Sequence, residues 1–210
     1  MKVRATGNLI AETTALRTGV AIVPSDHVAR LRVDGDRAFA ALDRLSTAPL
    51  YLREGQIRQT LFLDETARPI ADVVIASDET GYYVFAEGLT AASLAALITM
   101  DGTADLEVTN LCDTHDAIAL HGPRAWEVVS ALLGPAVLGM PFLSFLNAKD
   151  VICFRVGGSG EFGYQLLVPP AACGGASRPH RGGGRGEGPR DDRPFNPRSG
   201  GTRKRCLQHP

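Results

Sequence analysis

Residues 33–39 read Val-Asp-Gly-Asp-Arg-Ala-Phe, and residues 120–126 repeat the pattern 87 positions later as Leu-His-Gly-Pro-Arg-Ala-Trp. Each stretch ends a strand, turns at a glycine and starts a helix with Arg-Ala followed by an aromatic residue. Glycine allows a sharp turn because it carries no Cβ, and the aromatic ring fixes the helix against the sheet. Two such units that share antiparallel sheets predict an α+β, ferredoxin-like arrangement rather than a doubly wound parallel sheet.

The sequence around the first stretch alternates between strand and helix patterns. Residues 27–33 predict a half-buried strand. The apolar spacing of residues 38–45 predicts an amphipathic helix that Asp34 or Asp36 caps and that ends near Ser46. Three apolar segments separated by acidic turns then predict an antiparallel meander over residues 56–63, 70–76 and 82–86.

The sequence around the second stretch follows the same plan. Two strands are predicted over residues 106–111 and 116–121, and Pro123 opens a helix because proline suits the first helical turn. The predicted buried stripes are Leu94, Leu97 and Ile98 on an earlier helix that Thr90 caps, and Trp126, Val129, Leu132 and Leu133 on the helix after Pro123. Two further strands are predicted over residues 151–156 and 162–168.

The composition is that of an ordinary chain of one or two domains, with 210 residues, 44% hydrophobic, 21% charged and a formal net charge of −1. No stretch approaches the roughly 18–20 apolar residues of a transmembrane helix, and no apolar block follows the N-terminus as in a secretory signal. A cytoplasmic protein without a membrane partner is therefore expected. The four cysteines are widely spread and form no C-x-x-C pair, which predicts reduced thiols and no metal site. Cys112 and Cys153 fall at strand positions and are predicted to be small buried hydrophobic residues.

Charge divides the chain near residue 170. Residues 171–210 contain nine Lys or Arg against three Asp or Glu, a net +6, whereas residues 1–170 contain thirteen against twenty, a net −7. The tail is rich in Gly, Pro and Arg and poor in apolar residues, so it is predicted to be disordered, while residues 1–170 form two interleaved α+β subdomains. A tether to nucleic acid or membrane fits the basic charge, but the tail holds one aromatic residue for stacking, and no nucleic-acid partner is expected. A GC-rich gene read out of frame explains this composition better.

Two carboxylates are candidates for chemistry. Asp72 interrupts the apolar run of residues 70–75, where ionisation requires a partner or a ligand unless the side chain faces solvent. Glu161 lies among glycines, so either the backbone approaches a ligand closely there or the residue is an exposed hairpin glutamate. The glycine-rich residues 157–160 lie between two predicted strands, without a following helix that could hold a phosphate.

Residues 160–169, Gly-Glu-Phe-Gly-Tyr-Gln-Leu-Leu-Val-Pro, resemble the G-E-x-G-(F/Y)-E-(I/L)-x-V-P signature of the aminomethyltransferase, or glycine-cleavage T-protein, family. Three more blocks resemble that family in the same order, namely residues 32–38 its R-V-x-G-x-D-A block, residues 69–74 its aspartate-bearing strand and residues 119–125 its A-L-Q-G-P-(K/R)-A block. The superfamily also includes folate-binding proteins of iron–sulfur assembly, demethylases and the folate-binding halves of sarcosine or dimethylglycine oxidases.

The resemblance implies a tetrahydrofolate site at the centre of a three-domain ring. In such proteins the strand aspartate, here Asp72, orients the folate and acts as the acid–base group while folate N5 attacks an aminomethyl carbon on a lipoyl arm. The signature glutamate, here Glu161, accepts hydrogen bonds from the aminopyrimidine edge of the pterin. Gln59 stands where the family has a tyrosine in the folate site. The implied partners are folate and a lipoyl carrier protein.

The chain also departs from the family pattern. The first aspartate of the family's pair is replaced by Ala71, an asparagine after the third meander strand by Ala86, a tyrosine before the signature by Gly158, and the second glutamate by Gln165. Each change removes a stacking or hydrogen-bonding group. We therefore expect a tetrahydrofolate-dependent aminomethyltransferase of the glycine-cleavage type that is impaired and lacks the family's C-terminal β-barrel domain. The alternatives are a non-catalytic folate-binding protein of the iron–sulfur assembly type and an inactive fragment.

Overall fold

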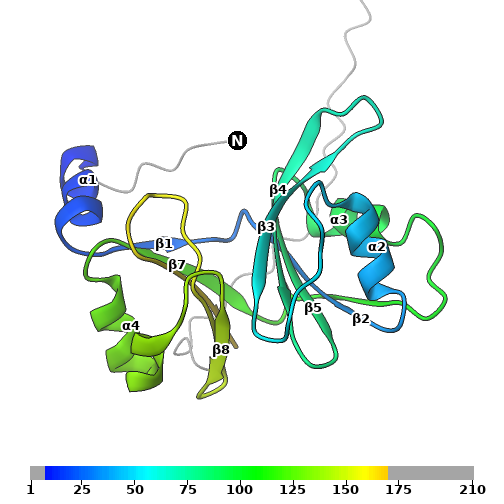
Figure 1. Ribbon diagram of the computed structural model, residues 1–210. Helices are drawn as coiled ribbons and strands as arrows, with labels where there is room; N and C mark the ends of the chain where they lie inside the picture. Colours follow the sequence, from blue (N-terminus) through cyan, green and yellow to red (C-terminus); the bar gives the residue numbers. More distant parts are fainter. Residues whose placement is uncertain (1–7, 170–210) are drawn as a thin grey trace, which may run out of the picture. The chain divides into compact units, whose positions relative to one another are not determined.

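The computed structural model describes residues 8–169, which fold into two five-stranded antiparallel sheets with helices packed against them (Figure 1). The first sheet has the order β3-β4-β5-β2-β6, and the second has the order β1-β7-β10-β9-β8. The first contains β2 (Ala29–Asp34), β3 (Ile57–Leu63), β4 (Pro69–Ser77), β5 (Gly81–Glu87) and β6 (Glu107–Asn110). The second contains β1 (Ala21–Pro24), β7 (Asp116–His121), β8 (Phe145–Ala148), β9 (Val151–Phe154) and β10 (Gly163–Val168). This architecture confirms the predicted α+β class.

Two helices, α2 (Ala38–Leu45) and α3 (Ala91–Ile98), lie on the same side of the first sheet (Figure 1). Side chains alternate between the two faces of a strand, and on β4 the buried Ala71, Val73 and Ile75 belong to the core that contacts these helices. The Thr90 hydroxyl accepts a hydrogen bond from the backbone N–H of Ser93, so the predicted cap of α3 is confirmed. The opposite face of β4 is turned away from α2 and α3.

The second sheet is covered by α4 (Ala125–Leu133) and the short 3-10 helix η1 (Pro135–Gly139). Ala125, Val129 and Leu133, four residues apart, form the buried stripe of α4. The prediction that Trp126 and Leu132 face inward is wrong, since 38% and 53% of their surfaces are exposed. They lie one position outside this stripe, at about 100° of rotation per residue.

The two sheets share a core of their own, in which aromatic rings meet. Phe154 on β9 packs edge-on against Tyr83 and Phe85 of β5, with ring centroids 5.6 and 4.8 Å away. It also stacks on Phe145 at 5.2 Å. Aromatic pairs in such geometries are attractive beyond their apolar burial. One face of each sheet therefore packs against the other sheet around Phe154.

The repeated glycine turns are equivalent in atomic detail. Arg37 N–H donates to the carbonyl of Asp105, two residues before β6, at 3.2 Å. Eighty-seven positions on, Arg124 N–H donates to the carbonyl of Gly19, two residues before β1, at 3.1 Å. The strand orders correspond as well, β6-β2-β5-β4 in one sheet and β1-β7-β10-β9 in the other. Both sheets contain the strand order of a ferredoxin-like unit, but in the second sheet the edge strand β1 comes from the beginning of the chain.

Two local predictions near these turns are wrong. Neither Asp34 nor Asp36 caps α2, whose N-cap residue is Arg37 without a side-chain cap bond. The Asp34 carboxylate instead accepts two hydrogen bonds from Arg32 Nε, at 2.9 and 3.0 Å, and backbone carbonyls satisfy the first amides of the helix. Cys112, predicted to be a buried strand residue, follows β6 and is partly exposed, whereas Cys153 is buried as predicted.

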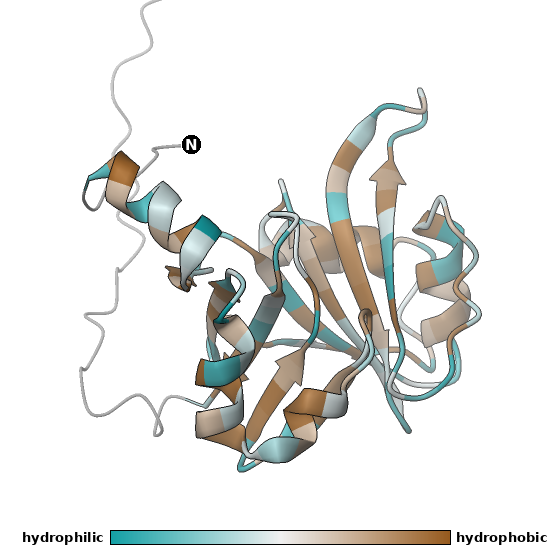
Figure 2. Cartoon of the chain, turned by 60° about the vertical axis from the view of Figure 1, so that its left-hand side comes forward, coloured by the Kyte–Doolittle hydropathy of each residue, from teal (hydrophilic) through white to brown (hydrophobic). Residues whose placement is uncertain are grey.

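Two elements at the start of the chain, α1 (Leu9–Thr18) and β1, and the edge strand β8 are additional to the predicted ones. Figure 2 shows teal, white and brown residues mixed around α1, which has no buried residue. Among the described helices, none is long and apolar enough to span a membrane. The predicted disordered tail, residues 171–210, lies outside the described residues.

Candidate functional site

A cleft of about 420 Å³ opens between the two sheets. The first sheet contributes Gln59, Asp72, Val74, Phe85 and Glu87. The second sheet contributes Val23, Ala119, His121, Phe154 and Gln165. The connection between β1 and β2 adds Ser25, His27 and Val28, and the loop after β9 adds Val156, Gly157, Gly158 and Ser159. A concave, largely apolar site with a few convergent polar groups is the usual form of a small-molecule site.

Asp72 lies on the cleft face of β4. Its neighbours Ala71 and Val73 point the other way into the core, so strand alternation turns the carboxylate toward the cleft. Because β4 pairs with both β3 and β5, Asp72 is not on an edge strand. The side chain is exposed, so it faces solvent within the cleft.

Two neighbours share that face with Asp72. Gln59 on β3 is opposite Val74, and Glu87 on β5 is directly opposite Asp72 in the strand register. Sequence reasoning missed Glu87 and singled out the preceding Ala86, which is fully buried in the core on the other face. The period of two along β5 was the signal that could have found it. The first sheet therefore presents one amide and two carboxylates to the cleft.

The opposite wall carries two polar atoms without a partner. Within the described residues, Nδ1 of His121 and Nε2 of Gln165 are buried and make no hydrogen bond. The strand register explains why these two side chains lie on the same wall. His121 on β7 pairs with Gly163 on β10, and Gln165, two residues further along β10, pairs with Ala119. A buried polar atom left unpaired costs about 1–3 kcal/mol. A ligand with matching donors and acceptors in this cleft would remove that cost.

Glu161 lies beside the cleft rather than on its lining. Its backbone N–H donates to the hydroxyl of Ser159, a lining residue, at 3.4 Å. Its Oε1 accepts a hydrogen bond from Arg17 Nη1 of α1 at 3.0 Å. The structure thus brings Asp72 and Gln59 together on one wall and places Glu161 next to the glycine-rich loop of the other.

Titration of the cleft histidine links stability to pH. Burial lowers the pKa of His121 below its ordinary 6.5, so the unfolded chain binds the proton more readily than the folded one. The free energy of unfolding is therefore expected to be highest above pH 6.5 and to fall as the pH drops below it, until the folded protein is protonated too. Urea titrations at pH 8 and pH 5.5 should show a smaller fall for His121→Gln, and an equal fall in both proteins would contradict this assignment.

Thiol and metal chemistry have little support in this region. Burial raises the pKa of Cys153 to about 12, so its thiol is not ionised at neutral pH. Among residues 8–169, no group of three or more His, Cys, Asp or Glu side chains is arranged to hold a metal ion. The polar side chains that line the cleft carry carboxylates, amides, imidazoles and hydroxyls.

This chain is similar to known proteins in sequence and in fold. The model of the family described as GCVT N-terminal domain matches residues 3–175. An aminomethyltransferase of Alkaliphilus oremlandii is 26% identical over 168 residues, which are 76% of this chain and 46% of that protein. The structure of glycine cleavage system aminomethyltransferase T from Bartonella henselae superposes with a TM-score of 0.68 at 23% identity, over 78% of this chain and 45% of the other.

A second solved structure extends the comparison. Heterotetrameric sarcosine oxidase from Corynebacterium sp. U-96 matches with a TM-score of 0.55 at 16% identity, over 78% of this chain and 84% of the matched chain. These two structures show that the fold is shared, and the strand orders of the two sheets confirm the ferredoxin-like prediction. The chain spans less than half the length of the curated relatives it matches.

Proposed function

Because the chain belongs to the GCVT N-terminal domain family, we propose that its cleft binds tetrahydrofolate and serves aminomethyl transfer of the glycine-cleavage type, with a lipoyl carrier protein as partner. One observation carries this proposal. The exposed carboxylate of Asp72 lies on one wall of the cleft, and the facing wall carries the polar atoms of His121 and Gln165 that have no hydrogen-bond partner. A polar heteroaromatic ligand supplies the donors and acceptors that these atoms lack.

The residues present fit such a ring system. Phe85, Phe154 and Val74 provide apolar contact area, and the glycines of the loop after β9 let a flat group approach the backbone. The Gln59 amide, Gln165 Nε2 and His121 Nδ1 are placed to hydrogen-bond ring nitrogens, amino groups and carbonyl oxygens. We include Glu161 among the folate contacts, since its Oε2 has no hydrogen bond within the described residues and can accept from an amino group.

Tetrahydrofolate, when bound, supplies the amine nitrogen that receives the one-carbon unit. The task of Asp72 is to accept a hydrogen bond from that part of the ligand and to take up or return a proton at a carboxylate oxygen. Glu87, opposite it in the register, places a second carboxylate acceptor beside Asp72. The apolar rings of Phe85 and Phe154 limit the access of water to these groups.

Asp72→Asn tests the proposal in the full chain. The Kd for tetrahydrofolate, kept reduced under anaerobic conditions, is expected to rise about tenfold to hundredfold, because a hydrogen bond to a charged group is lost. Release of ammonia from an aminomethylated lipoyl carrier should cease. The melting temperature should not change, since Asp72 is exposed. Asp150→Asn is the matched control, because Asp150 is exposed in the turn between β8 and β9, away from the cleft. Equal tetrahydrofolate affinity in both variants would refute a folate contact at Asp72.

The replacements at Gly158 and Gln165 favour a second candidate, a folate-binding protein without transferase activity. Both residues line the cleft, so the groups they replace in the resembled family are missing at the ligand itself. Ala71 and Ala86 carry no such weight, because they face the core. Tight binding of tetrahydrofolate without ammonia release from the lipoyl carrier would select this second function.

A further inference from the structure

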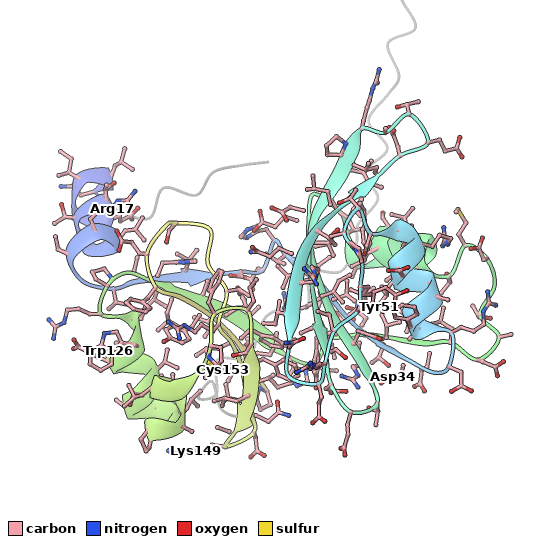
Figure 3. All side chains as sticks on the ribbon, in the orientation of Figure 1. Arg17, Asp34, Tyr51, Trp126, Lys149 and Cys153 are labelled. Atoms are coloured by element: carbon pink, nitrogen blue, oxygen red, sulfur yellow. The ribbon has the colours of Figure 1, made fainter. Side chains whose placement is uncertain are left out.

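The C-terminal end of helix α1 makes hydrogen bonds to other segments of the protein. None of its residues is buried. Arg17, in its last turn, reaches across to the loop after β9, where Nη1 donates to Glu161 Oε1 at 3.0 Å and to the Ser159 carbonyl at 3.3 Å (Figure 3). Just after the helix, the carbonyl of Gly19 accepts a hydrogen bond from the N–H of Arg124. One guanidinium nitrogen thus bridges two points of the same loop.

That loop forms a wall of the cleft through Gly157, Gly158 and Ser159. The two backbone segments at its base lie close together, since a Cβ at Gly163 would be 2.4 Å from the carbonyl oxygen of Val156. Its tip is rich in glycine, the residue with the most backbone freedom, and Gly160 has a φ of +80°. Ordering such a segment costs conformational entropy, so contacts from outside the loop help to hold its shape.

We propose that Arg17 is a positioning residue for the cleft: it holds the glycine-rich wall and the Glu161 carboxylate in place from outside. This inference rests on the proposed folate site for its effect on binding. Engagement of Oε1 by Arg17 leaves Oε2 for the ligand, and the bond to the Ser159 carbonyl fixes the lining backbone. Ligand affinity in the cleft therefore depends on an ion pair whose arginine is more than half exposed.

The test uses Arg17→Ala and Arg17→Lys in the full chain, with hydrogen–deuterium exchange as the first readout because it needs no ligand. Arg17→Ala should speed amide exchange in residues 158–162 several-fold without changing exchange in α4, and Arg17→Lys should restore part of the protection. Glu161→Gln should have a smaller effect than Arg17→Ala, because Arg17 still donates to the Ser159 carbonyl, and the double variant should add nothing to the effect of Arg17→Ala alone.

Binding of 5-formyltetrahydrofolate, a stable folate probe, is the second readout. Arg17→Ala should weaken it roughly two- to fivefold, as expected for an exposed ion pair. High NaCl should raise the Kd of the wild-type protein toward that of Arg17→Ala and leave the Kd of the variant unchanged. The matched control is Arg124→Ala, which removes a similarly exposed ion pair with Glu127 on α4 and should change neither readout.

The outcomes separate the two proposals. Unchanged exchange in Arg17→Ala, or a folate affinity equal to or tighter than that of the wild type, would overturn the positioning role. If Arg17→Ala speeds exchange of the loop but the wild-type protein does not bind the folate probe, the proposed function is refuted. The positioning role of Arg17 in the loop would still be supported.

Discussion

Replacing Arg30 by methionine is expected to lower the free energy of unfolding by about 3 kcal/mol and Tm by about 10 °C. Arg30 is 2% exposed, and its guanidinium donates to four backbone carbonyls, those of Ser25, Val28, Cys112 and His115. The first two lie in the connection from β1 to β2 and the last two in the connection from β6 to β7. Both connections run from one sheet to the other, so one side chain joins the two crossings.

Methionine has a similar length but no donors, so the carbonyls of Val28, Cys112 and His115 would lose the guanidinium donor, while that of Ser25 would keep the N–H of Val28. The control is Arg44→Met, which removes a partly exposed ion pair with Asp101 and should cost less than about 1 kcal/mol. Chemical denaturation of both variants gives the comparison. A loss at Arg30 no larger than that at Arg44 would show that the carbonyls find other donors and that the crossings do not depend on this residue.

Arg30 also shows why part of the fold was not predictable from the sequence. In residues 29–34 polar and apolar side chains alternate, and this pattern correctly predicts a strand. The same pattern assigns Arg30 to a solvent-facing side, because one strand carries no information about a second sheet behind it. The missed α1 has the complementary cause, since a helix without a buried stripe has no apolar period.

Some residues of the candidate site were predictable from the sequence, and others were not. Asp72 was conspicuous as a charge within an apolar strand, and Gln59 came from the resemblance. Glu87 and His121 became site residues through strand register, which pairs positions far apart in the chain. Register depends on turns and bulges, such as the shift between Phe62 and Leu63, that composition does not reveal. The chain could therefore be read for its elements more reliably than for the side chains that meet between them.

Gly35→Ala is expected to destabilise the protein by about 3–5 kcal/mol, the sum of a backbone penalty and a steric one. Gly35 has a φ of +102°, a conformation that residues with a Cβ rarely adopt. A Cβ there would lie 2.4 Å from the carbonyl oxygen of Asp105, which Arg37 N–H binds. The clash is with backbone, so relief requires α2 and the segment before β6 to separate.

Gly102→Ala isolates the steric part of this loss. Its φ of +104° is almost the same, but nothing lies within 4 Å of an added Cβ, so only the backbone penalty of about 1–3 kcal/mol applies. Gly122→Ala is the counterpart in the other sheet, where the Cβ would lie 2.4 Å from the Gly19 carbonyl oxygen and push α1 away. Equal losses at Gly35 and Gly102 would mean that the close approach of backbone is relaxed in solution. Large losses at Gly35 and Gly122 together would show that the repeated turns bear the same constraint, each one fixing a helix start to the segment before an edge strand.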